Sequence, residues 1–165
     1  MLILTLDFEG SLKTGIKEIG AVISNGTKIL HFEDHETKEN YECTHLLNEI
    51  LEFVPELFIS HNVHIEKNLL KKYLPYNKSK NELMNINWGP WLDTKEMYKV
   101  LYPQIEQYGL EYLTNLFVKK ESNEVCKAQC RTSKMSHHNA LYDAICTFLL
   151  FKRVFKKVNI QNFIH

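Results

Sequence analysis

The chain has 165 residues, a mass of 19.5 kDa and a formal net charge of zero, from 20 basic and 20 acidic side chains. This length suffices for one hydrophobic core, so we expect a single domain over residues 1–165. No apolar run approaches the roughly 18 residues of a membrane span, and the N-terminus lacks the basic start of a secretory signal. We therefore expect a cytoplasmic protein that has no contact with a membrane.

Apolar runs, their periodicity and the turn residues between them predict the secondary structure. In chain order, the expected elements are strands near 2–8, 16–24 and 27–33, a helix near 43–53, a strand near 56–60, a helix near 63–74, a strand near 88–93, helices near 94–101 and 109–118, and a helix from about 139 to 157. Three successive strands followed by alternating helices and strands predict an α/β sheet with helices on both faces.

The first predicted strand is strongly apolar and ends in Asp7, Phe8 and Glu9. Side chains alternate between the two faces of a strand, so Asp7 and Glu9 share a face, roughly 7 Å apart. Two carboxylates at the end of a buried strand need cations or hydrogen-bond donors, which makes the pair a candidate metal site. A solvated strand end is the alternative.

A further acidic residue, Glu66, falls in the first turn of the helix near 63–74, with Ser60 or Asn62 as the expected N-cap. There it either joins the same metal site or only offsets the helix dipole.

The last predicted helix is preceded by His138 and carries Asp143 in its first turns, with Asn139 as the expected cap. A histidine in that loop suits a general base beside a metal site. A surface or capping role is the alternative, and the adjacent His137 is the rival for the base.

These three segments, in this order, resemble the motifs of the DEDDh 3′-to-5′ exonucleases, a family that includes RNase T, oligoribonuclease and the proofreading subunit of bacterial replicative polymerase. The matching segments are Asp7-Phe8-Glu9, His61 to Glu66 and His138 to Ala144, with further similarity at Trp91 to Thr94 and at Tyr108 to Leu113. The resemblance covers nearly the whole chain and implies a ribonuclease H-like fold with a mixed five-stranded sheet. One departure is Glu66, because the family normally has aspartate there.

The resemblance implies metal-dependent hydrolysis of phosphodiester bonds at 3′ ends of nucleic acid, releasing nucleoside 5′-monophosphates. The expected substrate is single-stranded DNA, with RNA as the alternative, and a polymerase or another nucleic-acid-processing complex is a candidate partner. Two divalent ions, Mg²⁺ or Mn²⁺, are the expected cofactors. The implied metal ligands are Asp7, Glu9, Glu66 and Asp143, with His138 as general base; the implied substrate-binding residues are Phe8, Gly10, Ser11, Leu12, His61, Asn62 and Lys134. A weakly active or inactive nucleic-acid-binding subunit is the second hypothesis.

Charge is distributed unevenly along the chain. Residues 1–66 hold 4 basic and 12 acidic side chains, whereas residues 119–157 hold 9 basic and 3 acidic ones, so the C-terminal part could guide a phosphate backbone toward the acidic site. The basic residues just before the third motif are the candidates for these contacts: Lys119, Lys120, Lys127, Arg131 and Lys134. A solvated charged face is the alternative.

The four cysteines favour reduced thiols over a disulfide scaffold. The spacing of Cys126 and Cys130 also falls within the range of structural zinc sites, although a fourth ligand is not evident.

The longer side chain at Glu66 generates a first prediction. We expect Glu66→Asp to keep or increase nuclease activity, because the shorter carboxylate restores the family's arm length while keeping the charge. The rate of cleavage of a labelled oligonucleotide measures this, and complete loss of activity would argue against a place for Glu66 at the metals.

Overall fold

The computed structural model describes residues 1–74 and 89–164 and contains a mixed five-stranded sheet in the order β3-β2-β1-β4-β5. The strands are β1 (Leu2–Ser11), β2 (Gly15–Asn25), β3 (Lys28–Glu36), β4 (Leu57–Ser60) and β5 (Trp91–Asp93). The first three form antiparallel pairs, while β4 runs parallel to both β1 and β5. The predicted mixed sheet is therefore confirmed.

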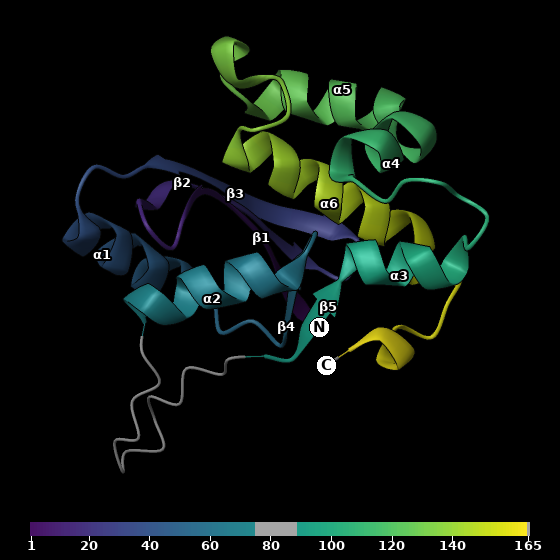
Figure 1. Cartoon of the computed structure of the whole chain (residues 1–165), viewed down its shortest axis with the longest axis horizontal. Coiled ribbons are helices and arrows are strands. Elements are labelled where there is room, and N and C mark those ends of the chain that lie inside the picture. The colour runs from purple at the N-terminus through teal and green to yellow at the C-terminus, as the bar shows by residue number, and fades with distance from the viewer. Residues whose placement is uncertain (75–88, 165) are drawn as a thin grey trace.

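Helices cover both faces of this sheet (Figure 1). On one face lie α1 (Asn40–Leu51) and α2 (Val63–Tyr73), and on the other lies α6 (Ala140–Phe155). The remaining helices are α3 (Thr94–Leu101), α4 (Leu110–Phe117) and α5 (Lys119–Gln129), with short 3₁₀ turns η2 (Thr132–Lys134) and η3 (Ile160–Phe163). Both α4 and α5 pack on the side of α6 that faces away from the sheet. No helix in the described ranges is long and apolar enough to cross a membrane.

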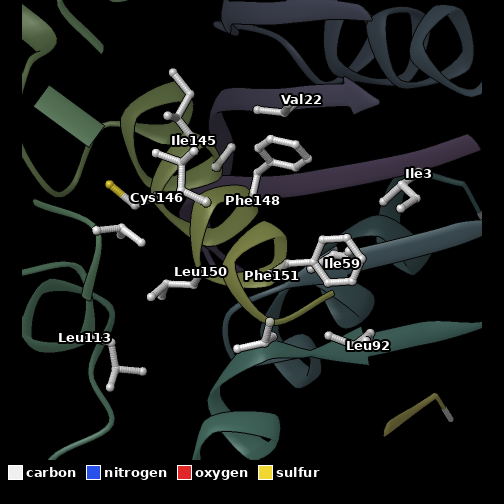
Figure 2. Close-up of a cluster of buried hydrophobic side chains, with 14 of the residues drawn as sticks. Ile3, Val22, Ile59, Leu92, Leu113, Ile145, Cys146, Phe148, Leu150 and Phe151 are labelled. Atoms are coloured by element: carbon white, nitrogen blue, oxygen red, sulfur yellow. The ribbon is translucent and has the colours of Figure 1, made fainter. Parts of the chain in front are cut away.

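The apolar faces of β1 divide the core into two clusters. Ile3 faces α6 and packs in one cluster with Val22 and Phe148, as Figure 2 shows. Leu4 and Leu6 face the opposite way and pack with residues of α1 and α2. Burial on both faces explains why the start of β1 is apolar at almost every position. Because alternation continues along the strand, Asp7 and Glu9 lie on the α6 face.

The main element that the sequence analysis missed is α5. Its sequence is mostly polar, and only Ser122 and Cys126 are buried, so no apolar periodicity marks it. The helix is held by packing on α6, a tertiary contact that local propensity does not encode.

Boundaries differ elsewhere. The first helix begins at Asn40 instead of residue 43, since the Glu42 side chain accepts backbone N–H bonds from Lys38 and Glu39 at 3.0 and 3.2 Å. The predicted third strand continues three residues further, to Glu36. Residue 88, where the strand near 88–93 was expected to begin, lies outside the described residues.

Gly20 sets how closely α6 approaches the sheet. It lies on β2 directly opposite Asp7, and a Cβ placed on it would come within 2.1 to 2.2 Å of backbone atoms of Ala140 and Leu141. Only glycine permits this contact, which brings the start of α6 onto the strand pair that carries Asp7.

We expect Gly20→Ala to lower the free energy of unfolding by about 3 kcal/mol, because the added methyl group forces α6 away from β2. Urea denaturation measures the change. Gly109→Ala is the matched control, since a Cβ at Gly109 meets nothing within 4 Å, and it should stay within about 1 kcal/mol of the parent. Equal stability of the two variants would contradict the packing argument.

Candidate functional site

The pair Asp7 and Glu9 lies at the end of β1, just before the strand loses its regular pairing. A register shift follows Glu9, and Gly10 has a φ of 147° with no room for a side chain, since its Cβ would lie 2.1 Å from the Gly15 carbonyl oxygen. This β-bulge interrupts the regular pairing immediately after the two acids, and pairing then resumes at Gly10 and Ser11. Both carboxylates are half-buried.

Asp143 reaches the same place from α6. The helix begins at Ala140, so His138 lies in the loop before it, as the spacing of the third motif predicted. One Asp143 oxygen accepts a hydrogen bond from His137 Nδ1, and the other accepts the His138 backbone N–H at 2.9 Å. These two bonds fix the carboxylate, which is 7% exposed.

The His138 ring points toward the acids. Its residue adopts a left-handed backbone with φ of 67°, and potential ligand atoms of Glu9, His138 and Asp143 lie within 4.8 Å of one another. In the described part of the chain, this is the group of side chains whose spacing could hold a metal ion. His138 is exposed, whereas His137 is half-buried against Asp143 and Tyr142.

Glu66 completes the acidic cluster from the first turn of α2. It is 5% exposed, and its Oε2 has no hydrogen-bond partner among the described residues. Burial, together with the nearby charges of Asp93 and Glu9, raises the pKa of Glu66 to about 8, although a backbone hydrogen bond works in the opposite direction.

Crowding of like charges perturbs the other acids as well. Burial, followed by the charges of Asp143, Glu66 and Glu9, raises the pKa of Asp7 well above its ordinary value. Burial and Asp143 likewise raise the pKa of Glu9, while His138 lowers it. Four carboxylates lie close together here, and one of their buried oxygens has no hydrogen-bond partner among the described residues. Such a site is suited to divalent cations such as Mg²⁺ or Mn²⁺, which prefer oxygen ligands.

Burial lowers the pKa of His137, but its hydrogen bond to Asp143 and the charge of that residue outweigh burial, so the pKa is raised overall. A protonated His137 is therefore favoured as a partner that holds Asp143 in place.

His61, at the start of the second motif, is held by two hydrogen bonds within the protein. His61 Nε2 lies 2.8 Å from the Tyr108 carbonyl oxygen, and its Nδ1 lies 2.9 Å from Thr94 Oγ1. Since a carbonyl can only accept, Nε2 carries the proton, and burial lowers the pKa of His61 and keeps it neutral. Both ring nitrogens are thus engaged within the protein.

Asp93 was not among the predicted site residues, yet it organises the second motif. Its oxygens accept the backbone N–H groups of Asn62 and Val63 at 3.2 and 2.9 Å, and also those of Lys95 and Glu96 at the start of α3. Asp93 is the N-cap residue of α3. Asn62 occupies the N-cap position of α2 in a left-handed conformation, but its side chain makes no cap hydrogen bond. One carboxylate therefore fixes the starts of two helices.

The side chain of Asn139, the predicted cap of the last helix, also makes no cap hydrogen bond. Asn139 occupies the N-cap position of α6, but its side-chain amide bonds back to Ser136, to the carbonyl oxygen at 2.9 Å and the hydroxyl at 3.2 Å. The amide therefore braces the histidine loop and leaves the helix N-terminus uncapped by a side chain.

The predicted substrate-binding residues near the end of β1 differ in their surroundings. Phe8 was expected to bind substrate, but it is 6% exposed and packs in the core. Leu12 is exposed in the loop after β1, and the Ser11 hydroxyl bonds to Thr14 at 2.9 Å. This loop is held to α2 by Lys72, which donates to the Leu12 carbonyl oxygen at 3.0 Å.

Several of the basic residues before and within α6 are already paired within the protein. Lys134 contacts Glu18 and Glu36, Arg131 contacts Asp34 and Glu36, and Lys152 contacts Glu121. Arg153 lies over the Phe117 ring and donates to the Tyr102 hydroxyl. By contrast, Lys119 makes no ion pair with the described residues.

A hollow of about 390 Å³ opens beside the histidines. Residues of α4, α5 and the loop 135–138 line it, among them Asn115, Lys119 and Asn123. Its polar lining, which also includes the Glu111 carboxylate, suits hydrogen-bonding groups such as base edges more than an apolar ligand.

The structure does not support a zinc site at Cys126 and Cys130. Cys126 lies against both Cys130 and Cys146, and all are free thiols. Among the described residues, these sulfurs do not combine with a histidine or acid at metal-binding distance.

No family model matches the chain, and no curated protein matches it. Among solved structures, Exonuclease X in complex with 5′ overhanging duplex DNA superposes with a TM-score of 0.64 at 20% identity, covering 98% of this chain and 96% of that one. E. coli Exonuclease I in complex with a dT13 oligonucleotide superposes with a TM-score of 0.62 at 13% identity. The match covers 98% of this chain but 42% of the Exonuclease I chain. The chain thus spans about two fifths of Exonuclease I. These likenesses show the ribonuclease H-like fold.

The raised pKa of Glu66 generates a prediction for pH. Between about pH 4.5 and 8, the folded protein holds a proton on Glu66 that the unfolded chain has released, so this residue's contribution to stability falls as pH rises through that window. We expect metal-free protein to lose on the order of 3 kcal/mol relative to Glu66→Gln between about pH 5 and pH 8.

Chemical denaturation of both proteins with chelator present measures the difference. Added Mn²⁺ should reduce the loss at pH 8 in the parent and have less effect on Glu66→Gln, because the ion compensates the buried charge. Parallel stability curves for the two proteins would show that Glu66 does not titrate in this window.

Proposed function

We propose that the protein is a metal-dependent 3′-to-5′ exonuclease that hydrolyses the terminal phosphodiester bond of single-stranded nucleic acid and releases nucleoside 5′-monophosphates. The observation that carries this proposal is the convergence of Asp7, Glu9, Glu66 and Asp143 around an exposed histidine, His138. The acids come from β1, α2 and α6, and one buried oxygen among them has no hydrogen-bond partner among the described residues. Acids with a purely structural or solvated role normally have such partners, so this arrangement favours a bound ligand.

The four carboxylates would hold two divalent ions, Mg²⁺ or Mn²⁺. When bound, such ions neutralise charge on the scissile phosphate and lower the pKa of water. In this arrangement, the charges of Asp143, Glu66 and Glu9 all act on Asp7, which places it among the other three acids. Hydrogen bonds from His137 and from the His138 backbone keep Asp143 in one orientation.

His138 would act as the general base. Its exposed ring can accept a proton from the attacking water and release it to solvent, and its position next to Glu9 and Asp143 places that water beside the phosphate. The left-handed backbone of His138 turns its ring toward the acids while its own N–H bonds to Asp143.

The substrate would be a strand end. The polar hollow beside His138 and the unpaired Lys119 can accept phosphate and base groups, and the exposed Leu12 can pack against a terminal base or sugar. The solved structures with the same fold include complexes with overhanging duplex DNA and with dT13, which supports DNA as the first substrate to test.

A second candidate function is nucleic-acid binding without efficient turnover, for example as a subunit associated with a polymerase. The raised pKa of Glu66 favours this alternative, because a carboxyl that is protonated at neutral pH binds metal weakly until an ion displaces the proton.

The test is a gel of 5′-labelled single-stranded DNA and RNA of one sequence, incubated with Mg²⁺, Mn²⁺ or chelator. We expect a descending ladder that requires metal, because hydrolysis from the 3′ end shortens a strand whose label stays at the 5′ end. Label released at once as a mononucleotide would indicate the opposite polarity, and intact label with retained binding would support the binding-subunit alternative.

Matched variants assign the residues in the same assay. Asp7→Ala should abolish the ladder, and His138→Ala should remove most turnover. His137→Ala should keep the larger part of the activity, since its ring supports Asp143 without being the base. The reverse result for the two histidines would move the base to His137.

A further inference from the structure

Acidic residues form two rows across the three antiparallel strands. Glu9, Glu18 and Glu36 lie side by side on β1, β2 and β3, and Asp7 and Asp34 flank Gly20 in the next row on the same face. Like charges directly opposite one another destabilise a sheet. The rows therefore need cations at both ends.

The β3 end of these rows is neutralised from within the chain. Lys134 Nζ lies 3.1 Å from Glu18 Oε1 and 2.8 Å from Glu36 Oε1, and Arg131 Nε lies 3.6 Å from Asp34 Oδ2. The Lys134 side chain is 14% exposed, whereas that of Arg131 is 59% exposed. Of the two, the lysine is the anchored one, because screening by solvent makes exposed ion pairs weak.

Both cations belong to the segment that carries the histidines. The turn η2 ends at Lys134, four residues before His138, and the Lys134 backbone N–H bonds to the Arg131 carbonyl oxygen at 2.8 Å. The loop is then braced at Ser136 by Asn139. A compact turn thus connects the ion pairs on β2 and β3 with the ring beside Glu9.

We infer that Lys134 is a positioning residue: by anchoring the turn η2 to Glu18 and Glu36, it sets the place of His138 against Glu9 and Asp143. This inference rests on the proposed function, in which His138 is the base. It also replaces the expectation that Lys134 contacts the phosphate backbone, since its ammonium group is largely enclosed between two carboxylates.

The charge of Lys134 has a second consequence for the site. Glu18 lies directly opposite Glu9, and its charge is one of those that raise the pKa of Glu9. With Lys134 on Glu18, the outer part of the row is compensated internally, which leaves Glu9 and Asp7 as the acids that must be balanced by a bound cation. The same lysine therefore supports the loop and leaves the uncompensated charge of the two rows on β1.

The experiment compares Lys134→Met with the parent in steady-state cleavage of a single-stranded oligonucleotide and in amide hydrogen exchange. We expect kcat to fall about ten-fold or more with KM within about two-fold, because misplacing a catalytic group slows the reaction without removing a substrate contact. Exchange should become faster at residues 131–139 and stay unchanged in β1. Lys134→Arg should recover part of kcat, since it keeps the charge.

Three comparisons keep the inference testable. Lys99→Met removes an exposed ion pair, that with Glu96 on α3, and should leave both constants unchanged. Glu36→Gln removes one half-exposed acceptor and should lower kcat less but in the same direction, which preserves the test if Lys134→Met does not fold. Lys119→Gln, at the hollow, should instead raise KM and reduce the salt dependence of binding.

A rise in KM with unchanged kcat and unchanged exchange in Lys134→Met would overturn the inference and restore a phosphate contact. If the parent protein shows no turnover at all, the proposed function fails separately. Hydrogen exchange then still decides the anchoring role, because faster exchange at residues 131–139 supports it and unchanged exchange refutes it.

Discussion

Repulsion among carboxylates at the end of β1 is the interaction to which the surrounding structure responds. Asp7, Glu9, Glu66 and Asp143 come from three separate elements, and burial together with their mutual charge raises the pKa of the first three. Such a cluster persists only where the rest of the fold holds it in place. Core packing on both faces of β1 provides that support, since the strand cannot move without disrupting two clusters of buried side chains.

The positive groups of the chain are arranged around this cluster in an ordered way. The N-terminus of α6 lies directly on Gly20, between Asp7 and Asp34, where the helix dipole favours negative charge. Lys134 compensates the acids toward β3. Among the described residues, Asp7 and Glu9 on β1 form no ion pair with a lysine or arginine, so divalent ions are the natural counter-charge there.

The second motif is held in a different manner, by neutral hydrogen bonds and one shared carboxylate. Asp93 joins the start of α2 to the start of α3, and His61 joins that region to the Tyr108 backbone ahead of α4. Glu66 is therefore positioned by a rigid frame. Its side chain is buried instead of turned toward solvent, and its Oε2 has no hydrogen-bond partner among the described residues.

The sequence by itself determined where the strands and most helices lie along the chain, the α/β class, and the segments that carry acids and histidines. These features follow from periodicity and short motifs, which are local properties. It could not reveal α5, whose polar sequence is helical through its contact with α6, nor Gly20, whose importance lies in a backbone approach from a distant segment. Only the tertiary structure decided that Phe8 belongs to the core and that Lys134 faces two glutamates instead of solvent. The physical reason is that burial and charge pairing depend on which segments meet in space, and residues far apart in the chain do not encode that meeting in any local pattern.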